Sequence, residues 1–263
     1  MKTNTKIIAT IGPSCDTLES LQSMVQEGVG TFRINMSHGD AESKKRLFDL
    51  VKSVNIDQGE RPAIIADLCG PKIRITDVPE NFHPNECSSV VLCNQKGLGE
   101  ICVTDSISFS DVSIGSKILI NDGKVQLEVK ELASAESLNC EVIIGGEILI
   151  GKGVNFPGIT LGVPALTDQD KDDLKLALNE GADWIALSFV RNAKDVQPVH
   201  AIMKDCNSYL PVMAKIEKWE ALEDLQNITE AFDGIMVARG DLGVEIPSGQ
   251  VPVAQKEIIE LAG

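Results

Sequence analysis

Three charged residues end two neighbouring apolar runs, and they could share one site. Lys215 and Glu217 close the run at residues 211–217, and Asp241 follows the run at residues 234–238. Both runs have the length and composition of buried parallel strands. Apolar residues at helical spacing between them predict a strand–helix–strand unit. Because ligands bind at the carboxyl ends of such strands, we expect the three side chains to face one pocket.

The chemistry open to these groups involves a metal ion and an anion. Side chains alternate along a strand, so Lys215 and Glu217 point the same way while Ile216 points into the packing. Glu217 and Asp241 offer hard oxygen ligands that suit Mg²⁺ completed by water and phosphate. Lys215 beside such a metal suits a phosphorylated substrate. A structural Lys–Glu ion pair and a helix-capping Asp explain the same residues equally well.

Longer blocks of the sequence resemble the pyruvate kinase family. AKIE at residues 214–217, followed by DGIMVARGDLGVEI at residues 233–246, matches the family too closely and in too ordered a way for chance. Further blocks follow in the family's order: TIGP at 10–13, RINMSHG at 33–39, Asp67 with GPKIR at 70–74, and GVNFP at 153–157. The resemblance covers essentially all 263 residues.

The resemblance implies the last step of glycolysis, phosphoryl transfer from phosphoenolpyruvate to ADP to give pyruvate and ATP. It makes Arg33 and Lys215 catalytic and substrate-binding. The guanidinium fork of Arg33 holds the substrate phosphate, and Lys215 neutralises the transferred group and the developing enolate. Glu217 and Asp241 hold Mg²⁺ or Mn²⁺, and free backbone N–H groups at Gly240 and Asp241 bind the substrate carboxylate.

Three further residues are nucleotide-binding by the same resemblance. Arg74 and Lys152 flank an inserted β domain, so its closure brings both onto nucleotide phosphates. His38 lies near the nucleotide in the family. The alternatives are a strand-end ion pair for Arg33 and an ordinary loop position for His38.

A departure from the common family pattern concerns K⁺. Many pyruvate kinases have Thr-Lys after the third-strand Asp and Glu after the Gly-Pro. They bind K⁺ at positions matching Asn35, Ser37, Asp67 and the carbonyl of the next residue, here Leu68. This chain reads DLCGPK at residues 67–72, with Lys72 in place of that Glu. A tethered ammonium can replace a monovalent cation. The chain resembles the branch that works without K⁺, so we expect K⁺ not to be required; in the alternative, Lys72 is solvated and K⁺ binds.

Composition is that of an ordinary soluble protein. The chain is 43% hydrophobic and 24% charged, and its net charge of -15 argues against binding to nucleic acid or anionic membranes. No segment has the features of a signal peptide or the length of a transmembrane helix, so we expect a cytoplasmic protein. The seven cysteines lack Cys-x-x-Cys spacing and are interpreted as reduced thiols.

The order of predicted elements indicates an α/β fold with three parts. Residues 1–71 and 157–263 each hold three strand–helix units, which implies a parallel sheet with right-handed crossovers. Residues 72–156 lack helical periodicity and read as a small all-β domain, a lid. The six predicted strands lie at residues 6–11, 31–35, 62–67, 184–190, 211–217 and 234–238.

Six units are two short of an eight-stranded barrel. The resemblance implies a (β/α)8 TIM-type barrel with the β domain, itself a small barrel, inserted after strand three. We therefore expect a chain truncated after strand six, without the family's seventh-strand catalytic Thr and its C-terminal domain. For a full-length parent we expect a homo-tetramer.

Two other functions remain open from the sequence. One is an inactive fragment or pseudoenzyme that binds phosphoenolpyruvate or a partner protomer. The other is a different Mg²⁺-dependent barrel enzyme acting on pyruvate enolates. The nucleotide clamp of Arg74 and Lys152 argues against the second, because enolate lyases need no such clamp.

Overall fold

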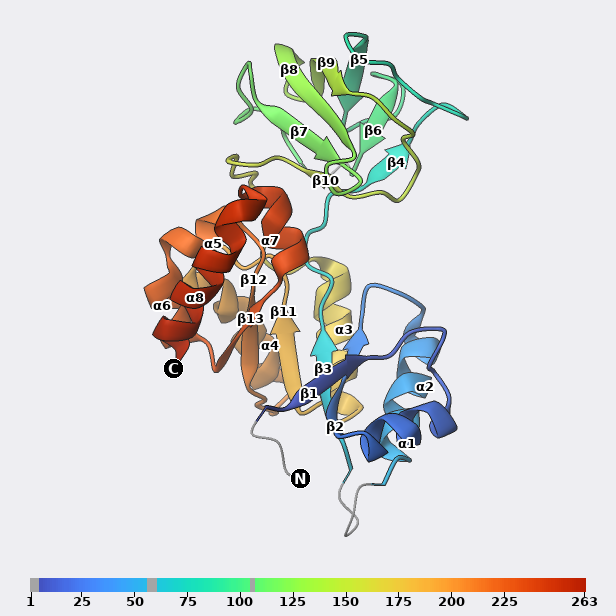
Figure 1. Ribbon diagram of the computed structural model, residues 1–263, viewed down its shortest axis with the longest axis vertical. Helices are drawn as coiled ribbons and strands as arrows, with labels where there is room; N and C mark the ends of the chain where they lie inside the picture. The colour runs from blue at the N-terminus through green and yellow to red at the C-terminus, as the bar shows by residue number, and fades with distance from the viewer. Residues whose placement is uncertain (1–4, 56–60, 105–106) are drawn as a thin grey trace.

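A computed structural model describes residues 5–55, 61–104 and 107–263. It has two parts, a parallel α/β part and an all-β part at the carboxyl ends of its strands (Figure 1). Below, these are the α/β part and the β domain. The expected α/β class and the inserted all-β unit are both present. The eight-stranded closure and the boundaries at residues 71/72 and 156/157 stay predictions.

The α/β part is built on six parallel strands that lie side by side in chain order. They match the six predicted strands to within a few residues. The strands are β1 (Ile7–Thr10), β2 (Val29–Asn35), β3 (Ala63–Asp67), β11 (Trp184–Leu187), β12 (Val212–Ile216) and β13 (Gly234–Val237). β3 and β11 are neighbours although the whole β domain separates them in sequence. Parallel neighbours place all their carboxyl ends at one edge.

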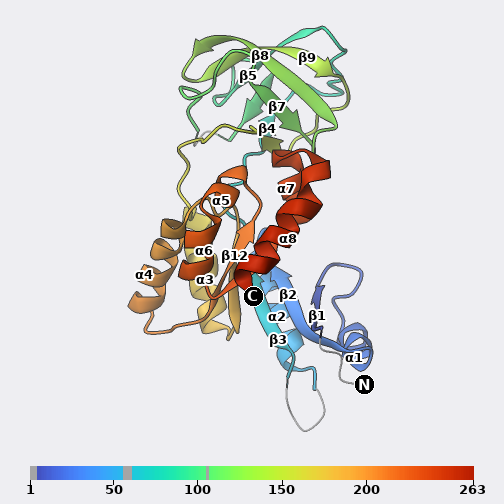
Figure 2. The same cartoon turned by 60° about the vertical axis from the view of Figure 1, so that its left-hand side comes forward.

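The helices flank this sheet (Figure 2). In chain order they are α1 (Leu18–Gln26), α2 (Ala41–Lys52), α3 (Asp168–Asn179), η2 (Ala193–Val196), α4 (Gln197–Asp205), α5 (Trp219–Glu223), α6 (Leu225–Ala231), α7 (Arg239–Glu245), η3 (Ser248–Gln250) and α8 (Val251–Ala262). Their apolar faces pack on one face of the inner strands and form one core that includes Phe32, Phe48, Leu174 and Ile216.

Helix starts follow side-chain capping. Thr167 begins α3 with a full capping box to Asp170. Thr17, the residue after Asp16, caps α1 by accepting from the Ser20 amide. The Asp16 carboxylate accepts from Arg46 instead. Between β12 and β13 the helix breaks in two at Asp224, whose carboxylate accepts from the Ala193 amide.

The β domain is a seven-stranded sheet in the order β10-β7-β8-β9-β5-β6-β4. An antiparallel bridge between Arg74 and Gly153 brings its first and last strands together, so the sheet nearly closes. Residues 121–123 form the left-handed turn between β7 and β8, as Asn-Asp-Gly predicts. The strands are β4 (Ile75–Asp77), β5 (Ser89–Cys93), β6 (Ile101–Val103), β7 (Lys117–Ile120), β8 (Val125–Ser134), β9 (Ser137–Ile144) and β10 (Val154–Asn155).

Two chain segments join the parts, and they are bonded to each other. The Ile75 amide donates to the Lys152 carbonyl at 2.9 Å, and the Val154 amide donates to the Ile73 carbonyl at 2.9 Å. We call residues 73–75 and 152–154 the hinge ribbon. Since the β domain has a core of its own, this ribbon is the chain connection between two separately packed parts.

Candidate active site

A cleft of about 250 Å³ opens at the carboxyl ends of the parallel strands. The strands β2, β3, β11 and β12 deliver polar side chains there, on them or just after them, because their apolar runs end at that edge. Most of the predicted site residues line it: Arg33, Asn35, Ser37, His38, Asp67, Leu68, Lys72, Arg74, Lys215, Glu217 and Asp241. Gly240 and Lys152, which were also predicted, are not among its lining residues.

Lys215 sits at the centre of a buried hydrogen-bond cluster. Its Nζ lies 2.8 Å from Glu217 Oε1, 3.1 Å from Asp67 Oδ1 and 2.7 Å from Ser188 Oγ. An ammonium has three protons, and these are three acceptors. Burial lowers the pKa of Lys215, but the carboxylates of Glu217 and Asp67 outweigh it and raise that pKa above its ordinary value. Lys215 therefore stays charged at neutral pH.

Arg33 and Asp67 form the second pair in the cleft. The Arg33 guanidinium pairs with Asp67 Oδ2 through Nε and Nη2, and its Nη1 donates to Thr10 Oγ1 at 3.0 Å. Asp67 is buried, whereas a quarter of the Arg33 side chain is exposed, at 26%. Arg33 is thus held from behind and open to the cleft, as a phosphate-binding group requires.

Glu217 is buried, and both its oxygens have protein donors. Oε1 pairs with Lys215, and Oε2 accepts the Phe189 amide at 2.8 Å. Burial raises the pKa of Glu217, Lys215 opposes the rise, and Asp241 adds to it. Each carboxylate oxygen keeps a second lone pair for a metal. The donor set of Glu217 and Asp241 fits Mg²⁺, which commonly takes one or two carboxylates and fills its other positions with water and phosphate.

The described residues contain no group of three or more His, Cys, Asp or Glu side chains able to hold a metal ion. A metal at Glu217 and Asp241 would therefore depend on water or substrate oxygens for its remaining ligands. That dependence is usual for Mg²⁺ and unusual for structural zinc.

Lys72 lies at the other side of the cleft. Its Nζ is 3.6 Å from Asp241 Oδ1 and 6.0 Å from the ring centre of Phe189. Asn35, one of the residues matched to the K⁺ site, accepts the Ser37 amide at 3.1 Å. Lys72 thus points at the Asp241 carboxylate, and the replacement of K⁺ by Lys72 stays a prediction.

Comparison with known proteins gives the family. Residues 2–262 match the family model described as pyruvate kinase, barrel domain. The chain belongs to the pyruvate kinase family.

Curated relatives agree with this assignment. Pyruvate kinase 2 of Synechocystis sp. is 42% identical over 270 residues, covering 98% of this chain and 45% of the relative. Pyruvate kinase of Corynebacterium efficiens is 40% identical over 266 residues, covering 100% of this chain and 56% of the relative. That of Mycobacterium tuberculosis is 38% identical over 261 residues, covering 98% and 55%. The chain spans about half the length of the curated relatives it matches.

The hinge ribbon carries two residues that the pyruvate kinase resemblance assigned to nucleotide. Arg74 lines the cleft, and its Nη1 donates to the Gly151 carbonyl at 3.0 Å. Lys152 lies on the facing strand of the ribbon, where its carbonyl accepts the Ile75 amide. Both residues therefore lie where the two parts join. Separately, no helix in the described ranges is long and apolar enough to cross a membrane.

Sequence reasoning missed Ser188 and Phe189. Ser188 is buried, accepts from Lys215 and donates to the Leu68 carbonyl at 2.6 Å. Phe189 has φ +55°, a strained conformation for an aromatic residue, which aims its amide at Glu217. Gly70 allows this, since a Cβ there would lie 2.7 Å from the Phe189 ring. The one available signal was a polar Ser inside the apolar run at residues 184–190.

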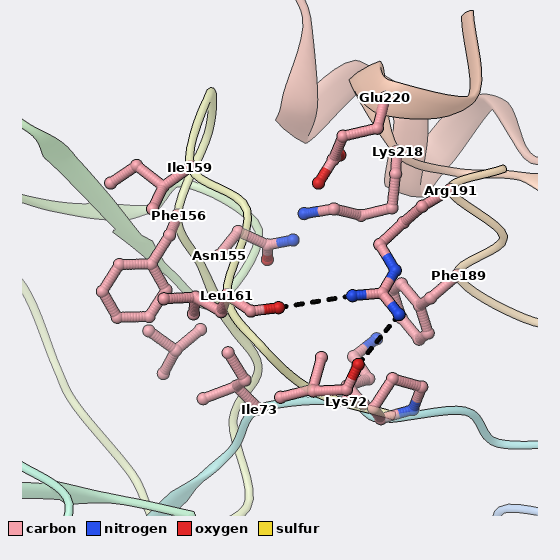
Figure 3. A pocket seen from close by; sticks show the side chains of 13 residues that line it. Lys72, Ile73, Asn155, Phe156, Ile159, Leu161, Phe189, Arg191, Lys218 and Glu220 are labelled. Carbon is pink, nitrogen blue, oxygen red and sulfur yellow. Dashed lines mark hydrogen bonds between the residues drawn. The ribbon is translucent and has the colours of Figure 1, made fainter. Parts of the chain in front are cut away.

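A second, smaller cavity lies behind Lys72 and Phe189 (Figure 3). At about 50 Å³ it has room for a few water molecules and not for a nucleotide. In Figure 3 Arg191 reaches across to the Leu161 and Val163 carbonyls, at 3.3 and 2.8 Å. These bonds tie the loop after β11 to the segment that leaves the β domain.

Two residues beside this cavity anchor α7, the helix that carries Asp241. Glu245, at the end of α7, is buried, and its Oε1 accepts from Lys218 Nζ at 2.7 Å and from Asn155 Nδ2 at 3.1 Å. Lys218 follows Glu217, and Asn155 belongs to β10 beside the hinge ribbon. One carboxylate therefore links α7 to both the sheet and the β domain.

Proposed function

We propose that this chain carries the phosphoryl-transfer site of a pyruvate kinase, which converts phosphoenolpyruvate, ADP and a proton to pyruvate and ATP. The observation that supports it most is the Lys215 cluster. A charged ammonium is fixed between the carboxylates of Asp67 and Glu217, and Glu217 is one of the two carboxylates suited to Mg²⁺, at the open end of the sheet. Phosphoryl transfer needs this kind of positioned charge more than covalent catalysis.

Each residue has a role that its surroundings allow. Arg33 holds the phosphate of phosphoenolpyruvate with its exposed face while Asp67 fixes its other face. Lys215 presents positive charge to the phosphoryl group in transfer and to the enolate oxygen left behind. Backbone N–H groups at Gly240 and Asp241, in the first turn of α7, bind the substrate carboxylate. Mg²⁺ held by Glu217 and Asp241 would supply further neutralisation of the phosphates.

The β domain is proposed to act as a lid over ADP. Arg74 and Lys152 on the hinge ribbon would reach the nucleotide phosphates as the β domain closes, with His38 at the cleft wall. Mn²⁺ could replace Mg²⁺ at the same carboxylates. The ammonium of Lys72 is proposed to remove the need for K⁺ at the niche of Asn35, Ser37, Asp67 and Leu68. The full-length parent is proposed to be a cytoplasmic homo-tetramer.

A second candidate is a chain that binds phosphoenolpyruvate or a partner protomer without turnover. The supporting observation is the edge strand β1, where Ile7 and Ile8 are 44% and 46% exposed. Within the described residues, β1 and β13 each pair with one neighbour only. Apolar edges of this kind are usually covered by another segment or chain.

A coupled assay with lactate dehydrogenase tests the proposal. The purified chain receives phosphoenolpyruvate, ADP and Mg²⁺, with and without K⁺, beside Lys215→Met and the matched surface control Lys204→Met. Turnover that is the same with and without K⁺, and that is lost only in Lys215→Met, supports both the proposed kinase activity and the proposed role of Lys72. Turnover that needs K⁺ overturns the role of Lys72 alone. A folded chain that binds phosphoenolpyruvate without turnover supports the second candidate.

A further inference from the structure

Two cysteines in the β domain lie against each other across neighbouring strands. Cys93 on β5 and Cys102 on β6 are direct register partners in a parallel pair. Their sulfur atoms are 2.8 Å apart, and both residues are buried. Both carry free thiols.

The backbone already satisfies the geometry of a disulfide. Neighbouring strands lie about 4.8 Å apart, and disulfides form when the two Cα atoms are about 4.4–6.8 Å apart. In-register residues of a parallel pair project to the same face, and the sulfur contact confirms it here. Closing the bond therefore requires a small side-chain movement and no change in strand pairing.

The other cysteines lack such a partner. Cys140, also buried on β9, has Val90 and Val129 as its register partners. Cys87 and Cys206 are exposed, and Cys15 and Cys69 are half-buried. In the described part of the chain the sulfur atoms of Cys15 and Cys140 contact backbone groups, whereas Cys93 and Cys102 contact each other, so the pair on β5 and β6 stands apart.

We propose that Cys93 and Cys102 form a reversible intramolecular disulfide when the protein meets a low-molecular-weight disulfide such as oxidised glutathione. One protein thiol loses its proton and attacks the small disulfide, which releases one small thiolate and leaves a mixed disulfide. The second protein thiol loses its proton and displaces the other small thiolate. Two protein thiols are oxidised by two electrons, and one small disulfide is reduced to two thiols.

The reaction should be slow in both directions. Burial and then the contact with Cys102 raise the pKa of Cys93 to about 12, so its reactive thiolate is scarce at neutral pH. The reagent must also pass the segment between the strands, residues 94–100, where the Gln95 carbonyl lies 3.7 Å from the Cys102 sulfur. Once formed, the bond is protected by the same burial. The disulfide between Cys93 and Cys102 would therefore be reduced more slowly than a disulfide formed at an exposed cysteine.

The disulfide would constrain β6, whose following residue Thr104 is hydrogen-bonded to the backbone of Arg74. Two residues beyond Cys102, the Thr104 amide donates to the Arg74 carbonyl at 3.0 Å, and the Thr104 hydroxyl accepts the Arg74 amide at 3.1 Å. A link between β5 and β6 therefore stiffens the support of one side of the hinge ribbon. An effect on nucleotide binding rests on the proposed function; formation of the disulfide does not.

Peptide mapping tests the bond directly. The purified chain is incubated with oxidised glutathione, alkylated without reduction and digested with trypsin. Because Lys96 lies between the two cysteines, cleavage places them on separate peptides, residues 75–96 and 97–117. We expect these two peptides to be joined, with a loss of two hydrogens, and to separate on reduction.

Variants assign the bond. Cys87 shares the first peptide, so Cys87→Ser must keep the link, while Cys93→Ala must abolish it. Recovery of unlinked Cys93 and Cys102 after a prolonged time course has reached its plateau would overturn the proposal, as would a link that maps to Cys87. The wild-type and Cys87→Ser maps decide the matter even if Cys93→Ala folds poorly. In an active sample, oxidation should raise the KM for ADP several-fold and leave that for phosphoenolpyruvate nearly unchanged; a KM for ADP that does not move would overturn the link to Arg74 only.

Discussion

The α/β part and the β domain bury different kinds of residue. Across residues 5–55, 61–104 and 107–263, every buried polar or charged residue lies in the α/β part, including Asp67, Ser188, Lys215, Glu217 and Glu245. The core of the β domain consists of apolar side chains and cysteine. Buried charges cost desolvation energy that only good pairing offsets. The two parts therefore differ: one holds the buried charges, and the other is a separately packed apolar unit.

The largest expected loss of stability follows from replacing Lys215, the buried cation of the α/β part. Replacing it with Met leaves Asp67 and Glu217 buried without their ammonium, which should lower the free energy of unfolding by about 3–5 kcal/mol at neutral pH. Protonation relieves a buried carboxylate. Since the pKa of Glu217 is already raised by burial, the loss should shrink as the pH falls. Urea unfolding in metal-free buffer measures the loss in free energy of unfolding at pH 7 and at pH 5. An equal loss at the two pH values would contradict this account.

The counterpart in the β domain is Leu127, which is fully buried on β8. Leu127→Ala should cost about 2–5 kcal/mol through lost burial and a residual cavity. No charge is exposed or unpaired by this change, so the loss should be the same at pH 7 and pH 5. Leu132→Ala, on the same strand but 38% exposed, is the control and should change stability by less than about 0.5 kcal/mol. If the stability lost in Leu127→Ala changed with pH, the proposed difference between the two parts would be contradicted.

Asn155 joins the two parts, and its loss should have a smaller effect. Asn155→Ala removes one donor to the Glu245 carboxylate, worth about 1–2 kcal/mol. We expect faster hydrogen exchange in β10 and α7 and little change in β8. Asn139→Ala, which removes a surface bond to Glu131, serves as the matched control. Unchanged exchange at α7 would show that Glu245 does not couple the helix to the β domain.

The smallest effect concerns the start of α2. The Ser43 hydroxyl and then the Ser43 amide lower the pKa of Asp40, which caps this helix. A carboxyl whose pKa is lowered on folding stabilises the protein above its unfolded pKa, and that contribution is lost as the pH falls through the folded pKa. Asp40→Asn keeps a capping side chain but should melt at a slightly lower temperature at neutral pH. The difference should vanish in acid; a difference that persists at pH 2 would contradict the assignment.

Strand ends and their chemistry could be predicted because they depend on local pattern. Period-two alternation predicted that Lys215 and Glu217 share a side, and the six apolar runs predicted the six parallel strands. What could not be predicted depends on contacts between distant segments. The left-handed backbone of Phe189 exists because Gly70, far away in sequence, leaves room for its ring.

Two further results lay beyond sequence reasoning for the same cause. The direction of Lys72 toward Asp241 depends on where α7 lies, and α7 is placed by Lys218 and Glu245. The contact of Cys93 with Cys102 depends on a parallel pair, β5 and β6, joined by a short connection. Parallel neighbours usually need a crossover of a dozen residues or more, so spacing alone argues against such a pairing.

The bonded hinge ribbon also bears on how the chain folds. β3 and β11 must pair although residues 68–183 separate them. If the β domain folds first, the bridge between Arg74 and Gly153 joins its two ends, and the segment still to be closed becomes about three times shorter. Closure entropy grows with the logarithm of length, so this saves about 1 kcal/mol. The β domain then acts as a folding nucleus that brings the two halves of the parallel sheet within reach of each other.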